Sequence, residues 1–214
     1  MKNKRLLAMN ARLGDGTYWK HPECVNYKIA FVGVNRAWIK YKADLMNRPV
    51  FLKREAGSSR KGVFANAAAL WSTISLVDEF YTEFKDKSVP ELLAEMTLED
   101  LVLWFLDDGC TTMRKGKHCL GRTYKHLLCV GDLLYDVPDG IEIFLDTMRR
   151  LFPKMKTVGT LCKNNSKTTE RNLVWNVPVP IAKTLIDRAL LLNIPGFENK
   201  LRTASMKYDT AHPG

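Results

Sequence analysis

The sequence predicts an α+β protein built from two pseudo-symmetric halves, each with the element order αββαββα. Segments with helical spacing and segments with alternating hydrophobic spacing follow one another in the same order twice along the 214 residues. The composition, with 46% hydrophobic and 26% charged residues, is that of an ordinary folded protein. We therefore expect a dimer fused into one polypeptide, with halves over 1–90 and 91–214.

The first half opens with helical spacing that ends at a Gly-Asp-Gly turn. Its expected elements are a helix over 4–13, a strand over 25–33, a helix over 36–48, a hairpin across 50–71 with its turn near 57–59, and a helix over 75–87. Ile29 and Phe31 alternate with Lys28 and Ala30, which predicts a half-buried strand whose second face is polar and basic. The apolar stripe expected on the second helix comprises Trp38, Tyr41 and Leu45.

The second half repeats this order after a short spacer. Its expected elements are a helix over 97–109, strands within 110–131, a helix over 138–152, a hairpin across 155–177 and a closing helix over 180–193. Thr97 as N-cap and Asp100 three residues later form an acidic variant of a capping box. Pro138 is expected in the first turn of its helix.

The charge balance indicates an anionic partner. Lys and Arg outnumber Asp and Glu by 33 to 23, which gives a net charge of +10, and a nucleic acid is the commonest partner for such an excess. A membrane surface is the rival partner, but no apolar run approaches the length of a spanning helix. The N-terminus lacks a small-residue cleavage site, so we expect no signal peptide.

The cysteines indicate a reducing compartment. Five cysteines include no C-x-x-C spacing, and we interpret them as reduced thiols in a protein that stays at its site of synthesis without export. That site is a bacterial or phage-infected cytoplasm, or an organelle matrix. No tetrahedral ligand set has recognisable spacing, so zinc is not expected.

Each half's first helix ends in an acidic residue followed by glycine. The two segments are 6–16, LLAMNARLGDG, and 101–109, LVLWFLDDG, and they place Asp15 and Asp108 at matching positions. Seen singly, each is an ordinary turn or helix stop. An aspartate at a helix C-terminus is electrostatically unfavourable, however, because that end already carries partial negative charge. Two such carboxylates at matching places favour a bound divalent cation with oxygen ligands.

These motifs resemble those of the LAGLIDADG homing endonucleases in their single-chain, two-motif, group I intron-encoded form. The segments that carry the resemblance are 8–16, AMNARLGDG, and 101–109, although Asn10 and Arg12 depart from the pattern in the first. The resemblance implies that the two motif helices pack side by side and that the two sheets form a saddle on DNA. It implies site-specific cleavage of both strands, with Mg²⁺ (or Mn²⁺) held by Asp15, Asp108, Gly14 and Asp107.

The same resemblance implies a lysine just after each half's last helix, near the scissile phosphate. Lys87 and Lys200 stand at the matching places, with Lys85 and Arg202 as close rivals. A cation there would stabilise negative charge in the transition state of phosphodiester hydrolysis.

Target recognition is expected from the polar faces of the sheets, because a twisted antiparallel ribbon fits the major groove. Some basic residues should only contact phosphates, and a few should read bases. The candidates are Lys28, Lys53, Arg54, Arg60, Lys61, Arg114, Lys115, Lys117, Arg122, Lys125, Lys163, Lys167 and Arg171.

The expected partner is double-stranded DNA with a long asymmetric target, bound by a monomer, since the two halves carry different side chains. Two alternatives stay open. One is a maturase of the same fold that binds intron RNA, and the other is a DNA-binding relative that does not cleave. Retention of Asp15 and Asp108 favours cleavage.

Overall fold

The computed structural model describes residues 2–19, 28–54, 69–76, 79–114, 123–163, 173–197 and 201. Contacts divide the chain into two compact units. The first comprises Met1–Ser88 with Ile194–Gly196, and the second comprises Val89–Asn193 with Phe197–Gly214. Each unit has its own four-stranded antiparallel sheet, so the α+β class expected from the sequence is confirmed.

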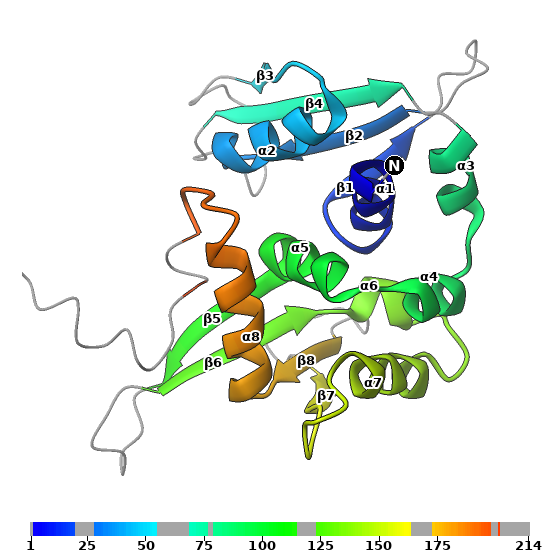
Figure 1. Cartoon of the computed structure of the whole chain (residues 1–214), viewed down its shortest axis with the longest axis vertical. Coiled ribbons are helices and arrows are strands. Elements are labelled where there is room, and N and C mark those ends of the chain that lie inside the picture. Colours follow the sequence, from blue (N-terminus) through cyan, green and yellow to red (C-terminus); the bar gives the residue numbers. More distant parts are fainter. Residues whose placement is uncertain are drawn as a thin grey trace, which may run out of the picture. The chain divides into compact units, whose positions relative to one another are not determined.

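Unit 1 has the order αββαββα (Figure 1). Its elements are α1 (Lys2–Leu13), β1 (Gly16–Trp19), β2 (Lys28–Gly33), α2 (Arg36–Met46), β3 (Phe51–Arg54), β4 (Leu70–Leu76) and α3 (Glu79–Asp86). The strand order is β1-β2-β4-β3. The hairpin expected across 50–71 is present as β3 paired with β4, while its turn near 57–59 lies outside the described residues.

One face of the unit 1 sheet packs against α1 and α2. Ile29 and Phe31 of β2 pair with Ser75 and Thr73 of β4, and all four side chains are buried. The alternation predicted for β2 is therefore confirmed on this face. Burial on α2 differs from the expected stripe, because Trp38 is joined by Ile39, Lys42 and Ala43, while Tyr41 and Leu45 are half-buried.

Lys42 is the unexpected member of the unit 1 core. It is fully buried, and its Nζ lies 4.4 Å from the ring centroid of Phe31 and 4.6 Å from that of Trp38. Aromatic faces attract a cation, which offsets part of its loss of hydration. Spacing alone assigns a lysine to the solvent side, so this position could not be found from the pattern.

Unit 2 has the same sheet and two additional helices (Figure 1). Its elements are α4 (Val89–Glu95), α5 (Leu98–Asp108), β5 (Gly109–Arg114), β6 (Thr123–Cys129), α6 (Gly131–Leu134), α7 (Gly140–Leu151), β7 (Thr160–Lys163), β8 (Leu173–Val177) and α8 (Val179–Leu190). The strand order is β5-β6-β8-β7, which matches that of unit 1.

Helix α5 is the centre of unit 2, and its start follows from the capping box. Thr97 Oγ1 accepts from Asp100 N, and Asp100 Oδ2 accepts from Thr97 N at 2.8 Å, as predicted. Trp104 meets Phe144 edge-on at 6.1 Å, and Phe144 meets Trp175 at 5.4 Å. Burying such aromatic pairs is a major source of stability for a domain of this size.

Several expected boundaries are wrong. The spacer between the halves is largely helical, as α4, because Leu92 and Leu93 are buried and Pro90 stands in its first turn, where proline is tolerated. The residues after Val130 form the short helix α6. Pro138 precedes α7, whose N-cap is Asp139 with φ 53°. Strand β4 continues to Leu76, so α3 begins later than 75.

Among the described residues, no helix combines the length and apolar character needed to cross a membrane.

Candidate functional site

Asp15 and Asp108 each stand where a motif helix turns into a strand. Helix α1 ends at Leu13 and β1 begins at Gly16, which leaves Asp15 in the corner with an exposed side chain. Asp108 is the last residue of α5, and β5 begins at the next residue, Gly109. The two corners belong to different units, so the pairing of the aspartates stays a prediction.

The glycine after each aspartate is required by close approach of the backbone. A Cβ on Gly16 would lie 2.3 Å from Ala11 Cα, and a Cβ on Gly109 would lie 2.2 Å from Phe105 O. Neither position has room for a side chain, because the strand folds back directly onto its own helix. The glycine therefore fixes the corner that holds the preceding carboxylate. This structural reason for the glycine of the motif could not be read from the sequence.

The Asp108 carboxylate is oriented by a hydrogen bond from its own helix. Trp104 Nε1 donates to Asp108 Oδ2 at 3.0 Å, and the Trp104 side chain is itself buried. A buried indole N–H needs an acceptor, so both groups gain from this contact. Asp107 and Gly14, the other expected oxygen donors, are half-buried beside their corners.

Arg12, which departs from the motif pattern, connects α1 to the end of α3. Its guanidinium donates to Lys85 O at 2.9 Å and to Lys87 O at 3.0 Å. The last carbonyls of a helix have no partner within the helix, so a cation is favourable there. The departure from the pattern thus has a structural role within unit 1.

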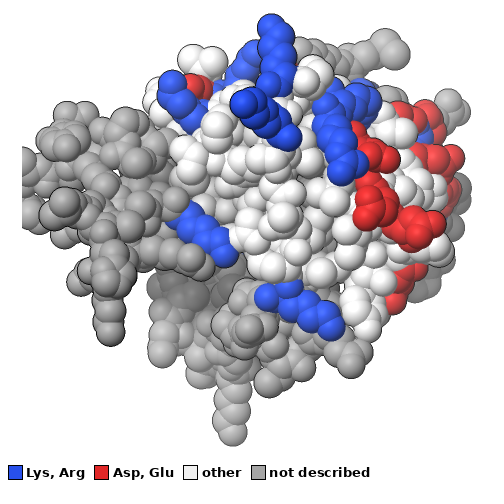
Figure 2. All heavy atoms as spheres, turned by 90° about the horizontal axis from the view of Figure 1, so that it is seen from below, with Lys and Arg blue, Asp and Glu red and all other residues white. Residues whose placement is uncertain are grey.

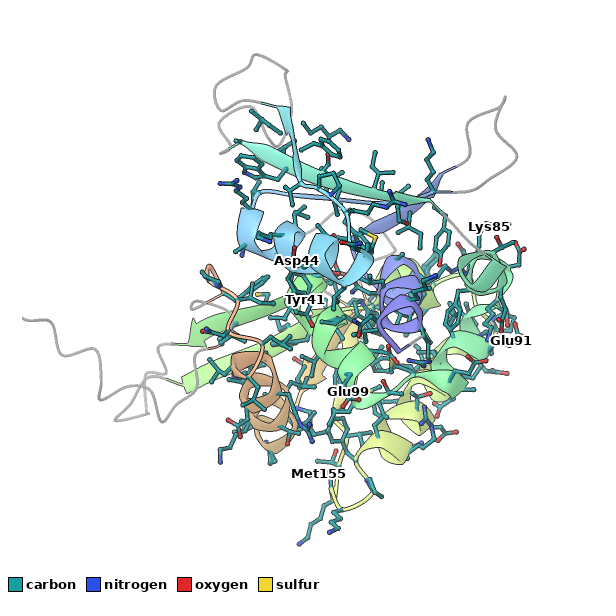
Figure 3. The ribbon with its side chains drawn as sticks, turned by 45° about the horizontal axis from the view of Figure 1, so that its top comes forward. Tyr41, Asp44, Lys85, Glu91, Glu99 and Met155 are labelled. Carbon is teal, nitrogen blue, oxygen red and sulfur yellow. The ribbon has the colours of Figure 1, made fainter. Side chains whose placement is uncertain are left out.

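Lys87 lies just after α3, as expected, and its side chain is held in place. Its Nζ pairs with Glu83 Oε1 at 3.1 Å and lies 4.6 Å from the ring centroid of Phe84. The side chain is 14% exposed. Lys85, drawn in Figure 3, instead pairs with its neighbour Asp86.

Lys200 and Arg202, the candidates after the last helix of unit 2, lie outside the described residues.

The strands pair in the same register within each of the two sheets, so each position in one sheet has an equivalent position in the other. Gly16 pairs with Phe31 in unit 1, and Gly109 pairs with Leu128 in unit 2. Lys28 stands three residues before Phe31, and Lys125 stands three residues before Leu128. The two lysines therefore occupy equivalent positions. Both lie on the outer face of their sheet, which is the face opposite the buried alternation.

The other basic candidates stand at a bulge, at strand ends or outside the described residues. Lys53 lies at a β-bulge in β3. Lys163 is exposed at the end of β7, on the same side of the strand as Leu161, which is the side that faces the helices. Arg54 and Arg114 end β3 and β5 with side chains outside the described part. The remaining candidates also lie outside it, namely Arg60, Lys61, Lys115, Lys117, Arg122, Lys167 and Arg171.

Basic residues on the sheet faces as the DNA contacts therefore remain a prediction, with Lys28 and Lys125 as the two candidates whose described side chains lie on the outer faces. Among the side chains that the structure describes on the regular strand pairs, each outer face carries one lysine beside uncharged residues. Figure 2 shows a related pattern, with Lys and Arg in separate groups on uncharged surface and Asp and Glu gathered along one side.

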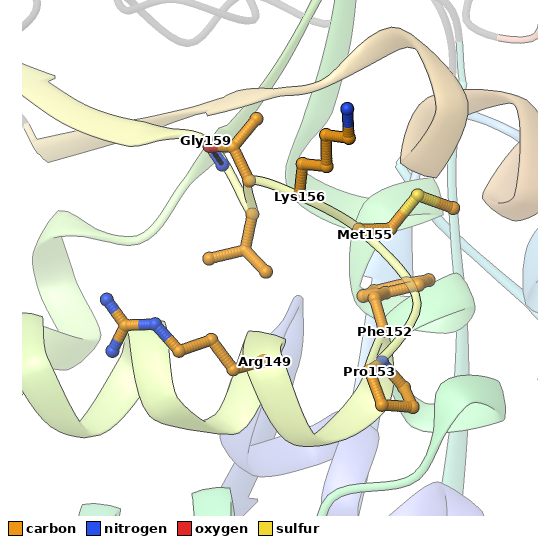
Figure 4. A pocket seen from close by; sticks show the side chains of 8 residues that line it. Arg149, Phe152, Pro153, Met155, Lys156 and Gly159 are labelled. Atoms are coloured by element: carbon orange, nitrogen blue, oxygen red, sulfur yellow. Dashed lines mark hydrogen bonds between the residues drawn. The ribbon is translucent and has the colours of Figure 1, made fainter.

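Neither the pocket of unit 2 nor its buried histidine offers a metal site. A cavity of 320 Å³ between α7 and the segment that follows it is lined by Arg149 and Lys156 among others, and none of its lining residues is Asp, Glu, His or Cys (Figure 4). His126 Nδ1 lies 3.0 Å from Thr111 Oγ1, and burial lowers the pKa of His126 below 6.5. Within the described part, no group of three His, Cys, Asp or Glu gathers.

The described cysteines Cys110, Cys129 and Cys162 form no disulfide within the described ranges, while Cys24 and Cys119 lie outside them.

The fold matches that of known DNA-bound nucleases. The structure of the homing endonuclease I-WcaI bound to its DNA recognition sequence matches with a TM-score of 0.64 and 17% identity, over 94% of this chain and 86% of that chain. The LAGLIDADG meganuclease I-AabMI bound to uncleaved DNA has a TM-score of 0.49 and 11% identity, over 94% and 87%. No protein-family model and no curated protein matches.

The fold is therefore that of a solved homing endonuclease, in agreement with the fold that the two motifs had implied.

Proposed function

We propose that the chain is a site-specific endonuclease that cuts both strands of a DNA duplex, with Asp15 and Asp108 as its catalytic carboxylates. The observation that carries the proposal is their equivalent placement. Each stands immediately before a glycine that turns a motif helix into the first strand of a sheet. The likeness to a homing endonuclease bound to its DNA recognition sequence and the net charge of +10 support DNA as the substrate.

Magnesium is the proposed cofactor, with manganese as a substitute, and the donors of the chain fit it chemically. Mg²⁺ prefers oxygen ligands and is usually held by one or two carboxylates together with substrate phosphates. Asp15 and Asp108 would hold it, with Gly14 and Asp107 as the neighbouring oxygen donors. When bound, it would supply positive charge against the scissile phosphate. It would also offset the unfavourable position of a carboxylate at a helix C-terminus.

The protein's own cations are proposed to act beside the carboxylates. Lys87, and Lys200 in the other half, would stabilise negative charge that develops on the phosphate. Glu83 and the Phe84 ring support this role for Lys87, because they hold its ammonium group in a defined place. Lys28 and Lys125 would contact DNA at equivalent positions of the two sheets.

The protein is proposed to act as a monomer on a long asymmetric site. Equivalent positions of the two outer faces carry different residues, such as Ile74 in unit 1 and Asn176 in unit 2, so the two half-sites would differ in sequence. A symmetric dimer would instead require a palindromic target. Intron RNA is a possible second ligand of the same basic surface, and the protein is proposed to remain where it is synthesised.

The test begins with a plasmid library that carries a randomised duplex cassette. The library is incubated with the purified protein and Mg²⁺, and cut molecules are captured by ligation and sequenced. We expect one family of related sites, cut at fixed positions on both strands. Asp15→Asn and Asp108→Asn should each abolish cutting while binding of the selected duplex is retained.

Asp44→Asn is the matched control, because Asp44 is an exposed aspartate of unit 1 that pairs with Lys40 (Figure 3). It should cut at the wild-type rate. With Lys87→Ala, cleavage of one strand should be slower by about a hundredfold to a thousandfold, so that nicked circles accumulate. Lys85→Ala should have little effect on either strand. Binding without cutting by the wild type would favour the non-cleaving relative. Binding of structured RNA alone would favour the maturase.

A further inference from the structure

Among the described residues, the outer face of the unit 1 sheet carries a group of apolar side chains, two of which are exposed. Val32 of β2, Ser72 of β4 and Phe51 of β3 stand in one row across the sheet, and Ala30 and Ile74 stand in the next. Phe51 is 51% exposed and Ile74 is 41% exposed. We call Ala30, Val32, Phe51 and Ile74 the apolar patch.

This face lies opposite the helices of unit 1. Phe31, which alternates with Ala30 and Val32, contacts Lys42 of α2, and Arg36 of α2 lies 4.6 Å from the ring centroid of Trp71, which alternates with Ser72. The apolar patch therefore cannot belong to the core beneath α1 and α2. Exposed apolar side chains grouped on one surface usually mark a contact with a ligand or partner.

Charge around the patch favours a polyanion as that ligand. Lys28 stands on the same face of β2, two residues from Ala30, and none of the described side chains on this face is acidic. If the proposed function is correct, the ligand is the major groove of one half-site. Among the groups that base pairs expose there, the thymine C5-methyl is the apolar one.

The two exposed positions of the apolar patch have more polar equivalents in unit 2. The shared register places Asn176 where unit 1 has Ile74 and Cys162 where unit 1 has Phe51, with Leu127 and Cys129 in place of Ala30 and Val32. Asn176 Nδ2 donates to Cys162 Sγ at 3.0 Å. The two faces thus differ most at the two positions where the patch is most exposed.

We propose that the apolar patch selects its half-site by contact with thymine methyl groups, so that one half of the target is recognised through methyl groups and the other is not. This inference rests on the proposed function and adds the chemical identity of the groups that unit 1 recognises. Specificity of this kind comes from the uncharged side chains of the face, and phosphate contacts are left to Lys28 and to basic residues elsewhere.

The experiment compares thymine with deoxyuridine, which lacks only the methyl group. A duplex selected from the library above is synthesised with deoxyuridine in one half-site, in the other, or in neither, and Kd is measured by fluorescence anisotropy without divalent cations. We expect Kd to rise about fourfold for each contacted methyl removed, the equivalent of burying one carbon group, and only when one particular half-site is altered.

Substitution of the patch should remove this discrimination. Ile74→Asn and Phe51→Cys introduce the residues found at the equivalent positions of unit 2, and each should bring the thymine-to-uracil ratio of Kd toward one. Ile141→Asn is the matched control, because Ile141 of α7 is also 41% exposed and belongs to unit 2. It should leave the ratio unchanged. Melting temperatures of the three variants verify folding.

The outcomes separate the two proposals. If the library yields no bound or cut site, the proposed function fails, and this inference fails with it. If a site is selected but deoxyuridine changes Kd less than twofold in both halves, the methyl inference is overturned while the endonuclease proposal stands. Equal loss in both halves, or discrimination that persists in Ile74→Asn and Phe51→Cys, also overturns it. The thymine-to-uracil comparison on the wild type decides the matter even if a variant fails to fold.

Discussion

Replacing Arg12 with methionine should destabilise unit 1 more than its position near a helix end suggests. The guanidinium donates two hydrogen bonds to terminal carbonyls of the α3 region, at 2.9 and 3.0 Å. Each bond from a charged donor contributes about 1.5–3 kcal/mol. Against this, Arg12 Nε is buried without a partner among the described residues, which already costs roughly 1–3 kcal/mol. The expected net loss from Arg12→Met is about 3 kcal/mol.

The assay is urea denaturation followed by circular dichroism. Methionine keeps most of the aliphatic stem of arginine, so the difference reports mainly on the lost donors. Arg149→Met is the matched control, since Arg149 pairs with Asp146 on the surface of α7 with 58% of its side chain exposed. A surface pair of this kind contributes about 0–1 kcal/mol. The slope of free energy against urea should be unchanged in both variants.

Arg12→Lys tests the geometry directly. An ammonium group is a point charge without the planar fork of arginine, so it should replace one of the two bonds and give an intermediate loss. If Arg12→Met changes stability no more than Arg149→Met, the two carbonyls are satisfied without Arg12 and the argument fails. If Arg12→Lys equals the wild type, charge alone suffices and the two-bond geometry is irrelevant.

Two further predictions concern unit 2. Trp104→Phe keeps one aromatic ring but removes the indole N–H that donates to Asp108, so single-turnover cleavage should fall about tenfold to a hundredfold with DNA affinity unchanged. Unchanged cleavage would show that this bond does not orient the carboxylate. Because burial lowers the pKa of His126 in the folded state, its contribution to stability is complete above the unfolded pKa of about 6.5 and is lost as pH falls from there through the lower folded pKa. His126→Ile, which copies the equivalent Ile29, should flatten the melting temperature between about pH 7.5 and 5.5, and equal slopes for variant and wild type would refute this.

Local signals in the sequence were sufficient to predict those features of the fold that depend only on residues close together in the chain. The capping box at Thr97 and Asp100 fixes the start of α5, and the alternation of Ile29 and Phe31 fixes the buried face of β2. Matching helix ends were also enough to select Asp15 and Asp108 as candidates.

Features that depend on partners distant in sequence could not be predicted. Arg12 reaches carbonyls more than seventy residues away, and Lys42 lies against the Phe31 ring, which belongs to a strand and not to its own helix. The charged sheet faces were expected because basic residues are frequent in the strand regions. In the structure, Lys28 and Lys125 lie on the outer faces, whereas Lys53 lies at a bulge and Lys163 at a strand end, because local strand irregularity is set by pairing that the pattern does not show.

The return of the chain to unit 1 has a consequence for any attempt to divide the protein. Asn35 Oδ1 accepts from Trp38 N at the start of α2, while its Nδ2 donates to Pro195 O at 2.9 Å. Gly196 packs against the same side chain, where a Cβ would lie 2.6 Å from Nδ2. One amide therefore joins a helix cap to the segment that follows α8 and belongs to unit 1. A fragment ending at Ser88 would lack this segment. Two co-expressed pieces, 1–88 and 89–214, would have to form the contact by association, without the high effective concentration that the intact chain provides.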